Sequence, residues 1–190
     1  MIRGVIFDCF GVLYGGSLDA LMTVCPPERR TELRDLNHAA DFGMITGDAY
    51  IAGLAELTGV SREGIEEIMH TRHIRNQQLI EYVESLRPHL KVGLLSNVSS
   101  GTIDPLFNPE DRARLFDATV LSYEEHIAKP HPEIYEIMAK RLGLLPEECI
   151  MVDDLASNCE GAEIAGMHSV LHSSNETTRY HIAKLIQENA

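Results

Sequence analysis

The sequence predicts an α/β fold in which a doubly wound parallel sheet carries an inserted group of helices. Short apolar segments recur along the chain, and the first four of them each end at a polar residue. Helical segments separate the later ones, and the long stretch 8–90 between the first two has helical patterns of its own. Strands that alternate with helices form a parallel sheet covered on both faces.

Five segments have the composition of buried strands. The first is Gly4–Phe7, which is followed by Asp8. The others are 91–95 before Ser96–Asn97, 118–121 before Ser122, 149–152 before Asp153–Asp154, and 168–172. In such sheets ligands bind beyond the carboxyl ends of the strands. We therefore expect Asp8, Ser96 and the two aspartates to meet in one crevice.

Two helices are expected between the later strands. Residues 133–142 have apolar side chains at helical spacing and are followed by Gly143, and residues 157–165 are followed by Gly166. Glycine directly after the last turn is typical of a helix end. These helices would cover the sheet.

The stretch between the first two strands is far longer than a normal connection of about 4–6 residues. Apolar residues at helical spacing predict four helices in it, at 28–42, 48–58, 61–72 and 76–86. We predict a core of residues 1–14 and 88–190 and a helical cap of residues 15–87. The cap would lie over the crevice, with Gly15 and Gly16 as a flexible entry.

The composition fits one globular core with a modest insertion, since 44% of the 190 residues are apolar. The net charge of −13 argues against nucleic-acid or anionic-membrane partners. No apolar run reaches the roughly 18 residues of a membrane helix, and Asp8 comes too early for a signal peptide. We expect a cytoplasmic protein with four reduced thiols: Cys9, Cys25, Cys149 and Cys159.

Four segments, in order along most of the chain, resemble the motifs of the haloacid dehalogenase (HAD) superfamily. Val5–Leu13 resembles its nucleophile motif, Leu94–Asn97 its second, Ala128–Tyr135 its third and Val152–Met167 its fourth. The resemblance implies a Rossmann-like HAD core with a small helical cap. Within the family, the sequence is most similar to small sugar-phosphate phosphatases and to the phosphatase domain of soluble epoxide hydrolases.

The resemblance also implies a Mg²⁺-dependent hydrolysis of a small phosphorylated metabolite. Asp8 would attack phosphorus and form an aspartyl-phosphate. Mg²⁺ would be held by Asp8, the backbone carbonyl of Phe10 and Asp154, with Asp153 close by or acting through water. Hard oxygen ligands of this kind suit that ion.

The remaining motif residues would bind the phosphate or support the loops. Ser96 and the backbone N–H of Asn97 would donate hydrogen bonds to phosphate oxygens, and Lys129 would supply positive charge to them and to Asp8. Gly11 and Asn158 would support the metal-site loops.

Several of these residues also have a purely structural interpretation. Ser96 and Asn158 could cap turns or helices, paired aspartates after a strand could cap a helix, and a lysine is usually solvated. Cys9 is expected to pack in the core, because alternation along a strand points it away from Asp8. The histidines show no metal-binding spacing.

Phe10 departs from the family pattern. Phosphatases of the family usually carry a second aspartate there as the general acid, and loss of a positioned acid costs about 10²- to 10⁴-fold in rate. Three functions stay open. The first is a phosphatase in which water or a cap residue such as Asp41 gives the proton. The second is a 2-haloacid dehalogenase, which carries an aromatic residue at this place but lacks the acidic metal site. The third is a phosphate-binding or regulatory module without efficient turnover. The substrate and the oligomeric state are not determined by the sequence.

Overall fold

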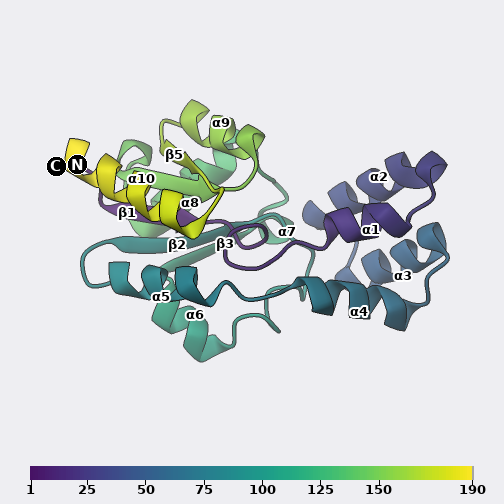
Figure 1. Cartoon of the computed structure of the whole chain (residues 1–190). Helices are drawn as coiled ribbons and strands as arrows, with labels where there is room; N and C mark the ends of the chain where they lie inside the picture. The colour runs from purple at the N-terminus through teal and green to yellow at the C-terminus, as the bar shows by residue number, and fades with distance from the viewer. Residues whose placement is uncertain (190) are drawn as a thin grey trace.

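The computed structural model describes residues 1–189 and contains one sheet of five parallel strands in the order β3-β2-β1-β4-β5 (Figure 1). The strands are β1 (Gly4–Phe7), β2 (Lys91–Ser96), β3 (Ala118–Leu121), β4 (Cys149–Asp153) and β5 (His168–Leu171). All five begin where the sequence predicts and end within one residue of the predicted end. The α/β fold class is confirmed, and the order of the chain reverses beside the central strand β1, where ligands bind in such folds.

Helices cover both faces of the sheet. They are α5 (Gln77–Leu86), α6 (Pro109–Leu115), α7 (Ser122–Glu125), α8 (Pro132–Leu142), α9 (Ala156–Ile164) and α10 (Asn175–Glu188), with the 3-10 turn η2 (Pro146–Glu148). Alternation along β1 sends Val5 and Phe7 to a core cluster shared with α5, α6 and α10. It sends Ile6 to a second cluster shared with α8 and α9. The sequence patterns do not predict α6, α7 or α10.

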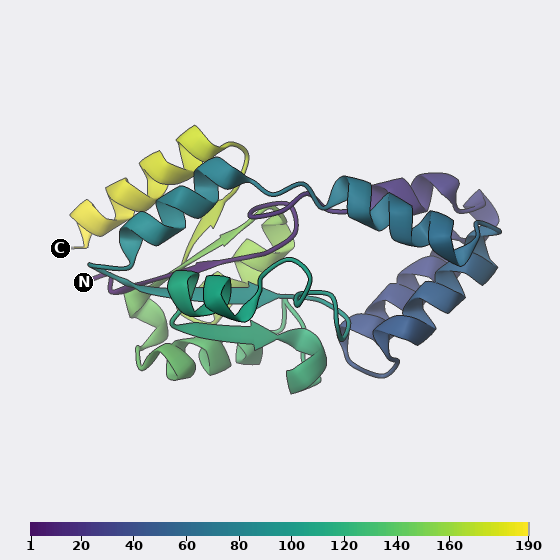
Figure 2. The ribbon, with the colours of Figure 1, turned by 90° about the horizontal axis from the view of Figure 1, so that it is seen from below.

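A separate lobe holds the inserted helices. These are α1 (Leu18–Val24), the 3-10 turn η1 (Pro27–Arg29), α2 (Arg30–Asp41), α3 (Gly47–Thr58) and α4 (Arg62–Arg72). The lobe, called the cap below, buries a hydrophobic cluster of its own that includes Leu21, Leu33, Leu54 and Ile65. Two connecting segments join it to the sheet, one after β1 and one before α5 (Figure 2).

Helix α5 lies within the range 15–87 that the sequence analysis assigned to the cap, but it packs on the sheet. Its side chains Leu79, Ile80 and Val83 belong to the core cluster of β1. The preceding Asn76 donates a side-chain hydrogen bond to the carbonyl of Val12 at 3.0 Å. Helix α5 therefore packs with the core, whereas the predicted boundary at residue 87 places it in the cap. The chain returns to the sheet before α5 begins.

Two hydrogen bonds from backbone N–H groups hold the cap over the carboxyl ends of the strands. The N–H of Gly15 donates to the carbonyl of Ile74 at 2.9 Å, and the N–H of Gly47 at the start of α3 donates to Ser100 Oγ at 3.0 Å. A side chain at Gly15 would meet the carbonyl of Arg72 at 2.3 Å, so this glycine permits the close approach of the two connections. Every helix within residues 1–189 is too short or too polar to cross a membrane.

Candidate active site

Three carboxylates lie together at the crevice that the strand ends predict. Asp8 follows β1, and Asp153 and Asp154 follow each other at the end of β4, which pairs with β1. One oxygen from each residue lies within 4.8 Å of the other two. Carboxylates at this distance repel one another, so the cluster requires a positive charge.

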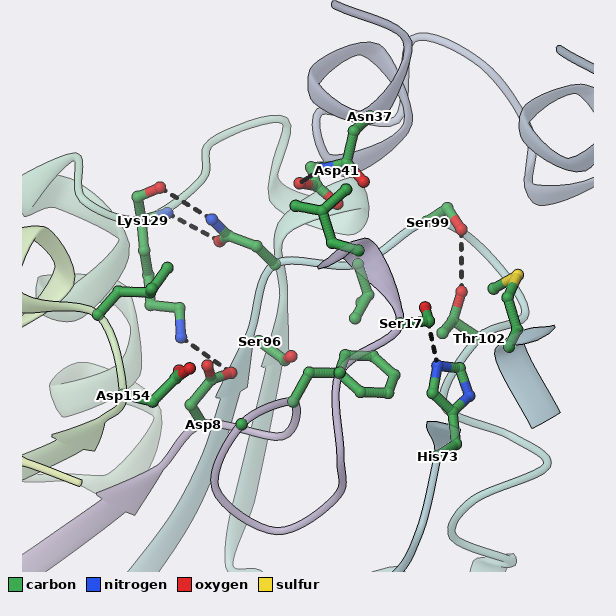
Figure 3. A pocket seen from close by; sticks show the side chains of 18 of the residues that line it. Asp8, Ser17, Asn37, Asp41, His73, Ser96, Ser99, Thr102, Lys129 and Asp154 are labelled. Atoms are coloured by element: carbon green, nitrogen blue, oxygen red, sulfur yellow. Dashed lines mark hydrogen bonds and ion pairs between the residues drawn. The ribbon is translucent and has the colours of Figure 1, made fainter. Parts of the chain in front are cut away.

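Lys129 lies against this cluster, and its side chain is 1% exposed. Its Nζ donates to Asp8 Oδ1 at 2.9 Å (Figure 3). It also donates to Asp153 Oδ2 at 2.6 Å. Burial acts to lower the pKa of Lys129, but the charges of the two carboxylates outweigh it and raise that pKa above its usual value. The side chain is therefore a charged ammonium group, not the solvated lysine of the structural interpretation.

The side chain of Asn97 positions this lysine. Its Oδ1 accepts a hydrogen bond from the backbone N–H of Lys129, and its Nδ2 donates to the carbonyl of the same residue, both at 2.8 Å. The two bonds tie the end of β2 to the loop after α7. Asn97 thus fixes the backbone from which the ammonium group reaches Asp8.

The electrostatics of Asp8 reflect its buried position. Burial raises the pKa of Asp8 to about 7, against the opposing charge of Lys129 and with a smaller contribution from Asp153. A cation in the crevice would lower this pKa, because it favours the ionised carboxylate. Adjacent Cys9 is fully buried in the core cluster, and burial raises the pKa of its thiol well above the usual value. It packs as expected.

The two aspartates of the pair have different surroundings. Asp153 is fully buried, and its Oδ1 accepts hydrogen bonds at 3.0 Å from the N–H of Leu155 and from Asn158 Nδ2. Asn158 is itself fixed by its carbonyl, which accepts from the hydroxyl of Tyr135 at 2.7 Å. Asp154 is less buried, and the pKa of its carboxyl is raised by burial and by the charge of Asp153. Both oxygens of Asp153 are thus occupied by protein donors.

The hydroxyl of Ser96 is buried and has no hydrogen-bond partner among the described residues. It lies beside Asp8 at the end of β2 and lines the same pocket (Figure 3). A buried polar group without a partner is costly, and its presence in a folded protein requires an explanation. A ligand oxygen in the crevice would supply the missing partner.

The loop after Asp8 brings its backbone close to Asp154. Gly11 has a φ of +86°, and a Cβ atom there would lie 2.2 Å from Asp154 Oδ2. Both the conformation and the contact require glycine. The neighbouring Phe10 lines the pocket and packs its ring on His73, with 4.5 Å between the ring centroids. No acid stands at this position.

The pocket over these residues has a volume of about 480 Å³ and is lined by both lobes. The cap contributes Ser17, Leu18, Asp19, Asn37, Asp41, Tyr50, Met69 and His73. Burial raises the pKa of Asp41 to about 7, although the charge of Lys129 opposes this. Of these cap residues, only Asp41 is a candidate from the sequence. The others follow no strand end and match no motif, so only the placement of the cap reveals them.

Comparison with known sequences gives a family and several relatives. The sequence model of a family described as haloacid dehalogenase-like hydrolase matches residues 2–166. The chain is 33% identical to a phosphoglycolate phosphatase of Salmonella typhimurium over 81 residues. This match covers 43% of this chain and 32% of that protein. The chain is 29% identical to a phosphorylated carbohydrates phosphatase of Thermotoga maritima over 103 residues. This match covers 53% of this chain and 47% of that protein. The matches thus span less than half the length of these relatives.

Solved structures share the fold over nearly the whole chain. A HAD family enzyme of Bacteroides thetaiotaomicron, in complex with magnesium and inorganic phosphate, superposes with a TM-score of 0.76 at 24% identity, covering 92% of this chain and 96% of that one. An L-2-haloacid dehalogenase of Xanthobacter autotrophicus superposes with a TM-score of 0.63 at 20% identity, covering 93% and 80%. At these identities the likeness shows the fold alone.

Proposed function

The chain belongs to the haloacid dehalogenase-like hydrolases, and we propose that it is a Mg²⁺-dependent phosphatase that acts on a small phosphate monoester through Asp8. One observation carries the proposal. Three carboxylates lie together, two of them pair with the buried ammonium group of Lys129, and the unpartnered hydroxyl of Ser96 lies beside Asp8. Such a site presents a nucleophile together with donors for the oxygens of an anion.

The donor set fits Mg²⁺. Asp8, Asp153 and Asp154 with Lys129 carry three negative charges and one positive charge, which leaves a net charge of −2 when all are ionised. Asp8, Asp154 and the backbone carbonyl of Phe10 would hold the ion, and Asp153 would act through water because protein donors occupy its oxygens. The bound ion would offset the repulsion between these carboxylates and a phosphoryl group.

The residues of the chain have distinct roles in the proposed reaction. A carboxylate oxygen of Asp8 attacks phosphorus, and the bond from phosphorus to the ester oxygen breaks. The ester oxygen takes a proton from water and leaves as an alcohol, and a water molecule then hydrolyses the aspartyl-phosphate to inorganic phosphate and free Asp8. Lys129, Ser96 and the N–H of Asn97 donate hydrogen bonds to the phosphoryl oxygens. Gly11 and Asn158 keep the loops in place.

Two other functions make different demands on the same site. A 2-haloacid dehalogenase fits the aromatic Phe10 but gives no reason for the acidic pair Asp153–Asp154. A phosphate-binding module fits both features and differs only in turnover, since Phe10 cannot supply a proton to a leaving alkoxide. The acidic pair favours phosphate over halide, and turnover decides between the phosphatase and the binding module.

Release of phosphate from p-nitrophenyl phosphate tests the proposal, because this leaving group needs little help from an acid. We expect slow turnover with Mg²⁺ that is lost with EDTA and in Asp8→Asn. Asp35→Asn, an exposed site on α2, is the matched control and keeps the activity. Turnover that survives the chelator would contradict the metal assignment. Tight binding of phosphate without turnover of any ester would favour the binding module. Release of halide from 2-haloacids without metal would favour the dehalogenase.

A further inference from the structure

The pocket wall on the cap side contains acidic and neutral polar groups but no free cation. Among the lining residues that the structure describes, Lys129 is the sole lysine or arginine. Its ammonium group is already engaged by Asp8 and Asp153. A phosphate group of the substrate would share this charge with them. A second acidic group on the substrate would find no positive partner.

Asp41 is held in this wall by a short chain of hydrogen bonds. Asn37 Nδ2 donates to Asp41 Oδ2 at 2.8 Å, and the hydroxyl of Tyr50 donates to Asn37 Oδ1 at 2.8 Å. The tyrosine thereby sets the amide so that its N–H group points to the carboxylate. Asp41 lies across the pocket from Asp8 (Figure 3). The other carboxylate oxygen of Asp41 takes no part in these hydrogen bonds and is available to a ligand.

The other ionisable groups of this wall do not compensate for Asp41. Asp19 also lines the pocket and adds a further negative charge. Its charge contributes to the raised pKa of Asp154, which is due mainly to burial and to the charge of Asp153. His73 is half-buried, and burial lowers the pKa of its ring. Its Nε2 lies 3.3 Å from Ser17 Oγ, so a neutral ring has a hydrogen-bond partner there. The wall is therefore acceptor-rich and negative at alkaline pH.

We propose that the alcohol part of the substrate carries no carboxylate and presents a hydroxyl or amino donor to Asp41. This inference rests on the proposed phosphatase function and names the substrate class within it. A carboxylate at the far end of the substrate would face Asp41 and Asp19 without a cation, and like charges placed together strongly disfavour binding. The inference separates this chain from its relatives that are named phosphoglycolate phosphatase, since phosphoglycolate carries a carboxylate.

Three two-carbon phosphate esters that differ at the far end test the inference: 2-hydroxyethyl phosphate, 2-aminoethyl phosphate and 2-phosphoglycolate. At pH 8 with Mg²⁺, we expect kcat/KM for the first two to exceed that for phosphoglycolate by at least about tenfold. Asp41→Asn keeps the shape and removes the charge, and should reduce this ratio to within about threefold, mainly through KM. Asp35→Asn on the same helix should leave the ratio unchanged.

Two results of the kinetic experiment would overturn the inference. One is equal or better turnover of phosphoglycolate by the unaltered protein, and the other is a ratio that Asp41→Asn does not change in a variant shown to be folded by circular dichroism. Failure to hydrolyse p-nitrophenyl phosphate would instead contradict the proposed function. In that case calorimetric titration of the three esters in Mg²⁺ measures the same order of preference as affinity, and equal or absent binding of all three would again overturn the inference.

Discussion

At the scale of single residues, the site separates groups that the sequence reveals from groups that only the fold reveals. Asp8, Ser96 and the pair Asp153–Asp154 were predictable because each lies at the end of a buried strand, and parallel strands bring such ends to one edge. Lys129 follows no strand, and it was identified through a motif resemblance. Asn37 and Tyr50 have ordinary helical surroundings in the sequence. They reach the pocket only because α2 and α3 pack over it.

Phe10 is the residue at which the chemistry can be changed directly. We predict that Phe10→Asp raises kcat for alkyl phosphates by at least about tenfold, because a carboxyl group there could protonate the leaving oxygen. The rate with p-nitrophenyl phosphate should change much less, since its leaving group needs little protonation. The measurement is the ratio of alkyl to aryl kcat in both proteins. Phe10→Asn also removes the contact with His73 but carries no proton, and an equal gain in that variant would refute the explanation.

Ser96 distinguishes a residue kept for a ligand from one kept for the fold. Its buried hydroxyl has no partner, so Ser96→Ala should leave the melting temperature unchanged or raise it, while kcat/KM falls at least about tenfold through loss of a phosphate donor. Buried Ser122 is the matched control, because its Oγ accepts from the N–H of Val98 at 2.9 Å. Ser122→Ala should cost about 1–2 kcal/mol in thermal unfolding. A comparable loss of stability in Ser96→Ala would show that its role is structural.

At the scale of elements, the sequence predicts whether a segment is a strand or a helix better than it predicts what that segment packs against. The strands were recognisable as apolar runs, and α8 was recognisable from its apolar spacing and Gly143, which has a φ of +71° and ends the helix. Helix α5 has an equally clear pattern, yet amphipathicity says only that a helix buries one face. It does not say whether that face meets the cap or the sheet, which is why α5 was assigned to the wrong lobe.

The junction between α3 and the loop after β2 controls how closely the cap lies over the pocket. A Cβ atom at Gly47 would lie 2.3 Å from the carbonyl of Ser100, so Gly47→Ala must push the start of α3 outward. We expect a rise of KM of about three- to tenfold, because substrate contacts from the cap weaken, and faster hydrogen exchange in residues 98–102. Ser100→Ala removes only the hydrogen bond to the N–H of Gly47 and should have a smaller effect. Equal effects would mean that the hydrogen bond, not the spacing, holds the cap.

At the scale of the whole molecule, two sources of negative charge act together. The chain has a net charge of −13, which is spread over its surface and is screened by salt. The carboxylate cluster lies at the ends of the central strands β1 and β4, and its members Asp8 and Asp153 are buried, so salt screens their repulsion much less. Any change that relieves the repulsion in the cluster therefore acts on the stability of the whole sheet. The surface charge responds to the ionic strength, whereas the cluster responds to a cation that binds within it.

This difference predicts that Mg²⁺ stabilises the protein specifically. At ten times its dissociation constant, an ion that binds only the folded state adds about 1.4 kcal/mol, which is a rise of about 3–6 °C in melting temperature for a chain of this size. NaCl at equal ionic strength should give a smaller rise, since it screens only surface charge. Asp154→Asn removes one proposed ligand and should abolish the excess due to Mg²⁺, whereas Asp35→Asn should keep it. If NaCl matches Mg²⁺, or if Asp154→Asn retains the full excess, the ion acts on the surface charge and the carboxylate cluster does not bind it.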